Sequence, residues 1–195
     1  MDIIESGIRF RFPETARSIK YDETKFYKDI FQNLPDAKGV DFISIHSNNI
    51  LIMEVKNCKG YEAENRWRIF KNNAKVSTAA IIPEGDRDSV DIEIAKKVAM
   101  TLSCLIGAHS KPDFQEKSDV LKPFFRFFEG KFLSRSEKEI RIVLFLEGDF
   151  ASDSRSEKMI LHELGESIEQ KLSWLNCKVL VENSNTYRRQ MYEVV

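Results

Sequence analysis

Alternating and helical patterns of apolar residues predict a chain in which strands and helices are interleaved. Period-two alternation and short apolar runs indicate strands, and apolar residues three and four positions apart indicate amphipathic helices. The strands predicted in this way cover residues 7–12, 40–46, 50–57, 139–147 and 177–181. The predicted helices cover residues 21–34, 61–75, 88–107, 119–128 and 156–175. Residues 77–88 fit either a short strand or a loop.

The interleaving of these elements favours an α/β fold with a mixed central sheet flanked by helices on both faces. The strand at residues 139–147 is apolar on both faces, which is typical of a strand in the middle of such a sheet. A length of 195 residues suits a single domain over residues 1–195. We expect the helix and strand within residues 154–182 to pack on the rest of that domain.

The second and third predicted strands form a hairpin that carries three charged residues among apolar ones. A two-residue turn at Asn48-Asn49 places Asp41 opposite Lys56, with Glu54 on the same face. Any loop with an even number of residues keeps the three side chains together, whereas an odd number moves Asp41 to the other face. The register of this turn therefore decides whether the charged residues form one site.

The apolar neighbours of these residues predict that the hairpin is buried on both faces. Burying an ionised carboxylate costs roughly several kcal/mol of folding free energy unless the group is paired or bound to a metal. Two carboxylates and one lysine leave an excess negative charge, which a hard divalent cation would neutralise. The alternative is that Asp41, Glu54 and Lys56 form a solvated cross-strand set that binds nothing.

The spacing of these residues resembles the PD-(D/E)XK nuclease superfamily, whose members share a restriction-endonuclease-like core. The resemblance rests on Asp41, twelve intervening residues, and then Glu54-Val55-Lys56 in a strand. It covers residues 21–108 and the strand at 139–147. Val40 stands where the family usually has proline. The family's strand before the aspartate has little room here, so we expect residues 7–12 to supply it.

What the resemblance implies is metal-dependent hydrolysis of phosphodiester bonds, with DNA as the expected substrate. Asp41 and Glu54 would bind one or two Mg²⁺ or Mn²⁺ ions, helped by the backbone carbonyl of Val55. Lys56 would position or help to deprotonate the attacking water, or stabilise the transition state.

Some members of the superfamily add an acid from the first helix, for which Asp22 and Glu23 are candidates. Acids in a first helical turn are also ordinary helix-end residues.

A basic segment follows the proposed site directly. Residues 56–75 contain six basic residues and two acids, a net charge of +4, with three aromatic residues interleaved. Besides Lys56, the basic residues are Lys59, Arg66, Arg68, Lys71 and Lys75. They are candidates for binding a nucleic-acid backbone, and the alternative is a solvated helix whose aromatic residues face the core. For Lys96 and Lys97 we favour a solvent-facing position over contact with a substrate phosphate.

The composition limits the other possibilities. With 30 basic and 31 acidic residues, the surface as a whole is not basic, so nucleic acid would need a local patch. Three widely spaced cysteines indicate neither a disulfide framework nor a cysteine zinc site. The acidic N-terminus and the absence of a long apolar run predict a cytoplasmic protein with no membrane partner. The cluster Phe124, Phe125, Phe127, Phe128 and Phe132 predicts core packing, or a homodimer surface where it is exposed.

Three hypotheses follow from these observations. The first is a Mg²⁺-dependent nuclease of PD-(D/E)XK type acting on DNA. The second is a catalytically silent nuclease-like module that binds nucleic acid or a partner protein. The third is an unrelated α/β interaction protein.

Overall fold

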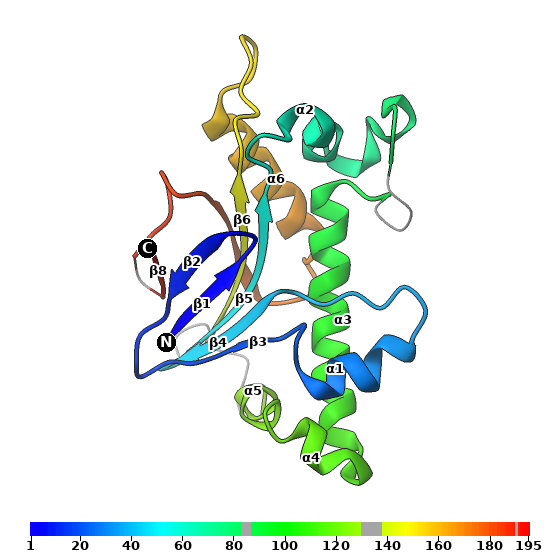
Figure 1. Ribbon diagram of the computed structural model, residues 1–195, viewed down its shortest axis with the longest axis vertical. Coiled ribbons are helices and arrows are strands. Elements are labelled where there is room, and N and C mark those ends of the chain that lie inside the picture. The colour runs from blue at the N-terminus through cyan, green and yellow to red at the C-terminus, as the bar shows by residue number, and fades with distance from the viewer. Residues whose placement is uncertain (83–86, 130–137, 190) are drawn as a thin grey trace.

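The computed structural model describes residues 1–82, 87–129, 138–189 and 191–195 (Figure 1). The strands are β1 (Asp2–Glu5), β2 (Ile8–Arg11), β3 (Arg17–Lys20), β4 (Phe42–His46), β5 (Asn49–Asn57), β6 (Glu139–Glu147), β7 (Cys177–Glu182) and β8 (Glu193–Val194). The α-helices are α1 (Lys25–Asp29), α2 (Glu62–Asn65), α3 (Val90–Ser110), α4 (Gln115–Ser118), α5 (Lys122–Phe127) and α6 (Glu157–Lys171).

The central element is a mixed sheet of five strands in the order β3-β4-β5-β6-β7. The first three strands are antiparallel neighbours, and β5, β6 and β7 are parallel neighbours. A parallel pair needs a crossover between its strands, and α3 and α6 lie in the two crossovers. The α/β class and the mixed central sheet predicted from the sequence are therefore confirmed.

Helices cover one face of this sheet, where α3 and α6 lie side by side (Figure 1). Their apolar stripes enter the same core as the inward side chains of β4, β5 and β6. The helical contributors include Ile94, Val98, Leu105, Ile160, Leu164 and Ile168, and the strand contributors include Ile43, Ile52, Ile142 and Leu144. The apolar residues of α3 and α6 recur at helical spacing and are buried, as the helical periodicity predicted.

A second, three-stranded sheet of order β1-β2-β8 covers the opposite face (Figure 1). Phe10 and Tyr192 of that layer pack against Phe42 and Phe145 of the central sheet. The expectation of helices on both faces is therefore wrong. The reason is that strands from the two ends of the chain pair with each other and take the position expected for a helix layer.

Several predicted elements differ from the observed ones. Residues 7–12 form β2 in the small sheet, so the edge strand of the central sheet comes instead from β3. The helix predicted at 21–34 is reduced to α1 and a 3₁₀ turn at Phe31–Asn33. The helix predicted at 61–75 consists of α2 and short 3₁₀ turns, because Asn72 and Asn73 have positive φ values that a helix does not allow.

The phenylalanine cluster is largely part of the core. Phe124 and Phe127 are buried, as the prediction of core packing required, whereas Phe132 lies outside the described residues. Across the described ranges, no helix has both the length and the apolar composition that a membrane crossing requires.

Candidate active site

The register of the β4–β5 hairpin brings Asp41 beside Glu54. The turn is Ser47-Asn48, and the ladder pairs His46 with Asn49 and Phe42 with Met53. Continuing this ladder by one position places Asp41 opposite Glu54. The predicted pairing of Asp41 with Lys56 is wrong, because the turn lies one residue earlier than expected. The turn still has two residues, so the three charged side chains share one face, as predicted.

These side chains face the helix layer at the end of β5 nearest to the start of α3. Ile50 and Ile52 point into the helix-covered core, and Glu54 and Lys56 continue the same side of the strand. Glu54 is 1% exposed and Asp41 is 9% exposed. The alternative of a solvated set of charges therefore does not hold for these two acids.

Residues from α3 and from the turn after α2 complete the cluster. The Lys97 Nζ lies 2.5 Å from Glu54 Oε1, and the Lys56 Nζ lies 2.9 Å from the same oxygen. Lys56 also pairs with Glu93 Oε1 at 2.8 Å, and Arg68 pairs with Glu93 Oε2. Glu93 and Lys97 are four residues apart, so they share one face of α3. Lys97 is thus in the site, contrary to the solvent-facing position favoured from the sequence.

The two neighbouring carboxylates are in unequal environments. Asp41 Oδ2 accepts a hydrogen bond of 2.7 Å from the amide of Val55. Burial, together with the nearby charge of Glu54, raises the pKa of Asp41 to about 7. Glu54 Oε2 is buried and has no hydrogen-bond partner among the described residues. The cluster therefore contains one carboxyl group that is costly to ionise and one buried carboxylate oxygen that is not satisfied.

Lys56 is held in its charged form. Burial would lower its pKa, but the carboxylates of Glu54 and Glu93 more than offset this and raise the pKa of Lys56. Burial would likewise raise the pKa of Glu93, and Lys56 and Arg68 lower it to about 2. A lysine that stays protonated is a poor general base. Of the roles implied by the resemblance, this favours positioning and charge stabilisation over deprotonation of water.

The residues present fit a Mg²⁺ or Mn²⁺ ion bound by few protein ligands. Within the described part of the chain, no group of three or more His, Cys, Asp or Glu residues is placed to hold a metal. Mg²⁺, however, often takes one or two carboxylates and completes its shell with water and phosphate oxygens. Asp41 and Glu54 supply that pair, with Oε2 of Glu54 available. The ligand role of the Val55 carbonyl stays a prediction, because the structure ties Val55 to the site through its amide.

The two further acids proposed from the sequence differ in position. Both precede α1, in the turn after β3. Glu23 is exposed and pairs with Lys20 at 2.7 Å. Asp22 Oδ1 is buried without a hydrogen-bond partner among the described residues, and burial together with Glu5 raises its pKa. The positive charge of Lys97 lowers the pKa of Asp22 and so opposes that rise. Asp22 is therefore near enough to the site to interact with Lys97. Asp22 is the better candidate of the two.

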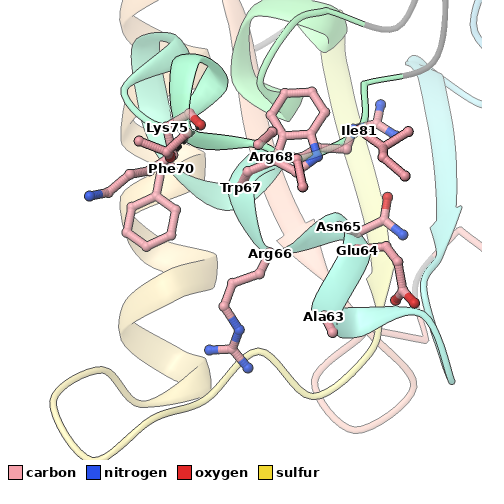
Figure 2. A pocket seen from close by; sticks show the side chains of 12 residues that line it. Ala63, Glu64, Asn65, Arg66, Trp67, Arg68, Phe70, Lys75 and Ile81 are labelled. Atoms are coloured by element: carbon pink, nitrogen blue, oxygen red, sulfur yellow. Dashed lines mark hydrogen bonds between the residues drawn. The ribbon is translucent and has the colours of Figure 1, made fainter.

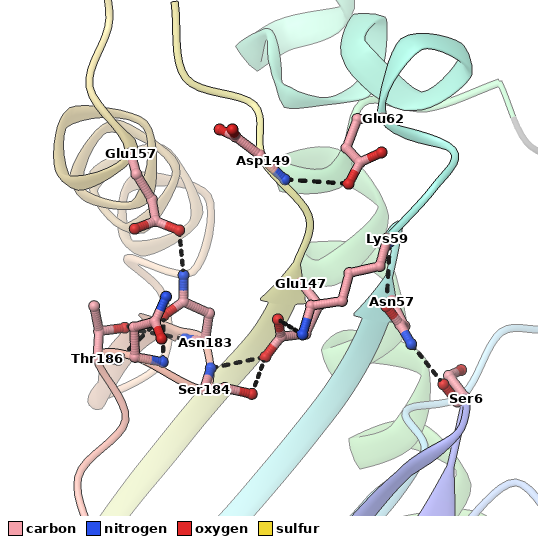
Figure 3. Close-up of polar contacts among 11 residues, drawn as sticks. Ser6, Asn57, Lys59, Glu62, Glu147, Asp149, Glu157, Asn183, Ser184 and Thr186 are labelled. Atoms are coloured by element: carbon pink, nitrogen blue, oxygen red, sulfur yellow. Dashed lines mark hydrogen bonds and ion pairs between the residues drawn. The ribbon is translucent and has the colours of Figure 1, made fainter.

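The predicted nucleic-acid-binding residues do not form one continuous track. Lys59 pairs with Glu147 at 2.8 Å in a polar cluster at the end of β6 that also includes Ser184 (Figure 3). Arg68 points inward to Glu93. Lys71 is exposed on a 3₁₀ turn, and Arg66 and Lys75 line a surface cavity. The segment is thus divided between the active-site cluster, a structural contact and the surface.

Glu93 belongs to the site but was not predicted from the sequence. It lies in the first turn of α3, where acids are common because of the helix dipole, so it did not stand out. Its spacing of four residues before Lys97 was the available signal. Only the packing of α3 against β5 shows that both residues reach the end of the strand.

Comparison with known proteins assigns a family but no activity. Residues 24–195 match the Family of unknown function (DUF6661). The chain belongs to this family. The matched region contains the cluster around Glu54 but begins after Asp22 and Glu23. No curated protein and no solved structure shows a significant match to the chain.

Proposed function

We propose that this protein is a metal-dependent nuclease that hydrolyses phosphodiester bonds in DNA. The observation that carries the proposal is the pair of buried carboxylates, Asp41 and Glu54, at the end of β5 beside two lysines. One carboxylate oxygen of the pair has no partner among the described residues, and the other acid has a strongly raised pKa. Buried groups perturbed in this way are typical of functional sites.

The topology around the site supports the proposal. Three antiparallel strands, β3 to β5, are followed by α3 and by β6, which lies parallel to β5. This order agrees with the restriction-endonuclease-like core that the sequence resembles. One difference is that α1 lies between β3 and β4, not before the first strand of the sheet.

The chemistry of the site follows from the positions of its side chains. When bound to Asp41 and Glu54, Mg²⁺ would lower the pKa of a bound water and neutralise developing negative charge. Lys56 is held between Glu54 and Glu93 and stays protonated. In this proposal it would orient the attacking water or a phosphate oxygen. Lys97 brings a second positive charge to the same oxygen of Glu54, from where it can contact the scissile phosphate.

A catalytically silent nucleic-acid-binding module is the second candidate, and the charge balance of the cluster favours it. Lys56, Lys97 and Arg68 carry as many positive charges as Asp41, Glu54 and Glu93 carry negative ones when all are ionised. Two lysines already contact Glu54 Oε1. A site neutralised by its own lysines has a weaker need for a metal ion.

A cleavage screen distinguishes the two candidates. We expect the wild type to cleave labelled DNA with Mg²⁺ or Mn²⁺ and not with EDTA, and we expect Asp41→Asn and Glu54→Gln to lower the rate by at least about 100-fold. Circular dichroism establishes that the variants fold. Cleavage retained in both variants would refute the nuclease proposal. Salt-sensitive DNA binding without cleavage by the wild type would favour the silent module.

Two adjacent lysines on α3 provide a matched control. Lys97 contacts Glu54, whereas Lys96 pairs with Asp88 at 2.7 Å on the surface. Lys97→Met is expected to reduce the cleavage rate, because it removes a positive charge from the site. Lys96→Met makes the same change one residue away and is expected to leave the rate unchanged. Equal effects of the two substitutions would argue against a role of Lys97 in the reaction.

A further inference from the structure

A cavity beside the candidate site is lined by aromatic and basic side chains, and we call it the Trp67 cavity. Its volume is about 570 Å³, within the range of roughly 300–1,000 Å³ common for ligand pockets. The wall is formed by residues 63–68, Phe70, Lys75 and residues 78–81. Figure 2 shows Phe70 and Ile81 on opposite sides of Trp67. The cavity thus lies in the segment that follows the site strand.

The lining combines apolar surface with positive charge. Trp67, Phe70 and Ile81 provide the larger apolar side chains. Two of the lining cations, Arg66 and Lys75, stand against one lining acid, Glu64, while the third cation, Arg68, is paired with Glu93. Arg66 and Lys75 form no salt bridge with any described residue, and the Lys75 ammonium lies 5.7 Å from the centre of the Phe70 ring. Such a lining suits a flat apolar group that carries a negative charge.

Arg68 joins the cavity to the candidate site. Its guanidinium carbon lies 5.9 Å from the Trp67 ring centre, and its terminal nitrogen pairs with Glu93. Glu93 in turn holds Lys56 at 2.8 Å. Asn65 and Arg68 line the cavity and also border a small void that Lys56 lines. The cavity therefore adjoins the site cluster, because Asn65 and Arg68 lie between it and Lys56.

We propose that the Trp67 cavity binds one unpaired nucleotide of a DNA strand, next to the phosphate held at the site. The base would lie against Trp67 and Phe70, and its phosphate would face Arg66 and Lys75. The identification of the bound strand as DNA rests on the proposed function. It adds a preference for single-stranded DNA, or for DNA with an unpaired base at the cut.

The preference follows from the shape of the substrate. In a duplex, both faces of each internal base are covered by its neighbours, so such a base enters a cavity only after it leaves the stack. An unpaired base needs no such step, and stacking on aromatic side chains is a common way to bind single strands.

The test uses Trp67 as its own reporter. The chain has two tryptophans, and Trp174 is exposed, so Trp174→Phe leaves Trp67 as the single source of tryptophan fluorescence. In EDTA, a 12-mer of thymidylate is expected to quench this fluorescence. We expect it to bind at least about 10-fold more tightly than a 12-mer of abasic sites or a blunt duplex of equal length. The abasic strand keeps every phosphate and lacks the bases. Equal binding of the thymidylate and abasic strands would overturn the proposal.

Two exposed isoleucines provide a matched pair of variants. Ile81 lines the cavity and is 83% exposed, whereas Ile106 lies on α3 and is 59% exposed. Ile81→Glu puts a negative charge in the cavity and is expected to weaken thymidylate binding about 10-fold. Ile106→Glu is expected to leave binding unchanged. Equal effects of the two substitutions would also overturn the proposal.

The failure of this proposal is distinguishable from the failure of the nuclease proposal, because binding is measured without metal. Base-dependent quenching in a protein that cleaves nothing would support the cavity and refute the nuclease. Cleavage that depends on Glu54, with no response of Trp67 to the thymidylate strand, would support the nuclease and refute the cavity.

Discussion

Asp41 makes the stability of the protein depend on pH. Its pKa is about 7 in the folded state, above the value near 3.8 expected for an unfolded chain. The folded state therefore binds more protons between these two values, and the free energy of unfolding falls as pH rises from about 4 to 7. About one pH unit above this pKa the group is ionised in both states, and the loss is complete. Asparagine is uncharged at every pH, so the Asp41→Asn variant does not lose unfolding free energy in this way.

We expect Asp41→Asn to become more stable than the wild type as pH rises. The difference in unfolding free energy should grow between pH 4 and 7, level off above 7, and reach about 2–4 kcal/mol. Urea unfolding in EDTA at several pH values measures it. Glu23→Gln, an exposed acid paired with Lys20, is the control and should show no such growth. A difference that does not change with pH would contradict the raised pKa.

Single residues of the site were predictable only where local periodicity decides their position. The pattern of the hairpin indicated that Asp41, Glu54 and Lys56 share a buried face, and the structure confirms this. The pattern misplaced the turn by one residue, because Ser47, Asn48 and Asn49 are all acceptable turn residues. The pattern could not show that Glu93 pairs with both Lys56 and Arg68, since that depends on how α3 and a 3₁₀ turn pack on the strand.

At the scale of elements, a buried aspartate fixes the start of α3 to its neighbours. Asp91 is fully buried and pairs with Lys171 of α6 at 2.7 Å. It also accepts hydrogen bonds from Ser89, Ser167 and the amide of Asn72. One side chain thus joins α3, α6 and the segment after α2 that carries the Trp67 cavity.

We expect Asp91→Ala to lower the free energy of unfolding by about 3–5 kcal/mol, because it leaves a lysine and several hydrogen-bond donors without their acceptor. Chemical denaturation followed by circular dichroism measures the loss. Glu169→Ala removes an exposed acid from α6 and should change stability by less than about 0.5 kcal/mol. Similar losses in the two variants would show that the Asp91 contacts contribute little.

The same contacts explain why the segment after α2 was poorly predicted. Its composition fits a helix, but Asn72 and Asn73 adopt positive φ values, and their amides donate to Asp91 and Ser89. Tertiary hydrogen bonds replace the helical ones. By contrast, β6 and α3, whose apolar patterns are long and regular, were predicted at nearly their observed bounds.

At the scale of the whole molecule, the second sheet was beyond prediction because its strands come from opposite ends of the chain. β2 pairs with β8, and β8 has only two residues, too few for any recognisable pattern. Phe10 links this sheet to the central one through edge-to-face contacts with Phe42 and Phe145, at ring-centre distances of 5.5 Å and 5.1 Å. The two cores share strands β4, β5 and β6, which favours a single cooperative unit.

Phe10→Ala tests that cooperativity. Removing a fully buried ring is expected to cost about 3–5 kcal/mol. Because the two cores share strands, we expect the loss to appear equally in far-UV circular dichroism and in the fluorescence of Trp67 and Trp174, which lie outside the small sheet. Exposed Ile4→Ala on β1 is the control and should change stability little. If the substitution of Phe10 shifts the circular dichroism transition but not the fluorescence transition, the small sheet unfolds separately and the chain is not a single folding unit.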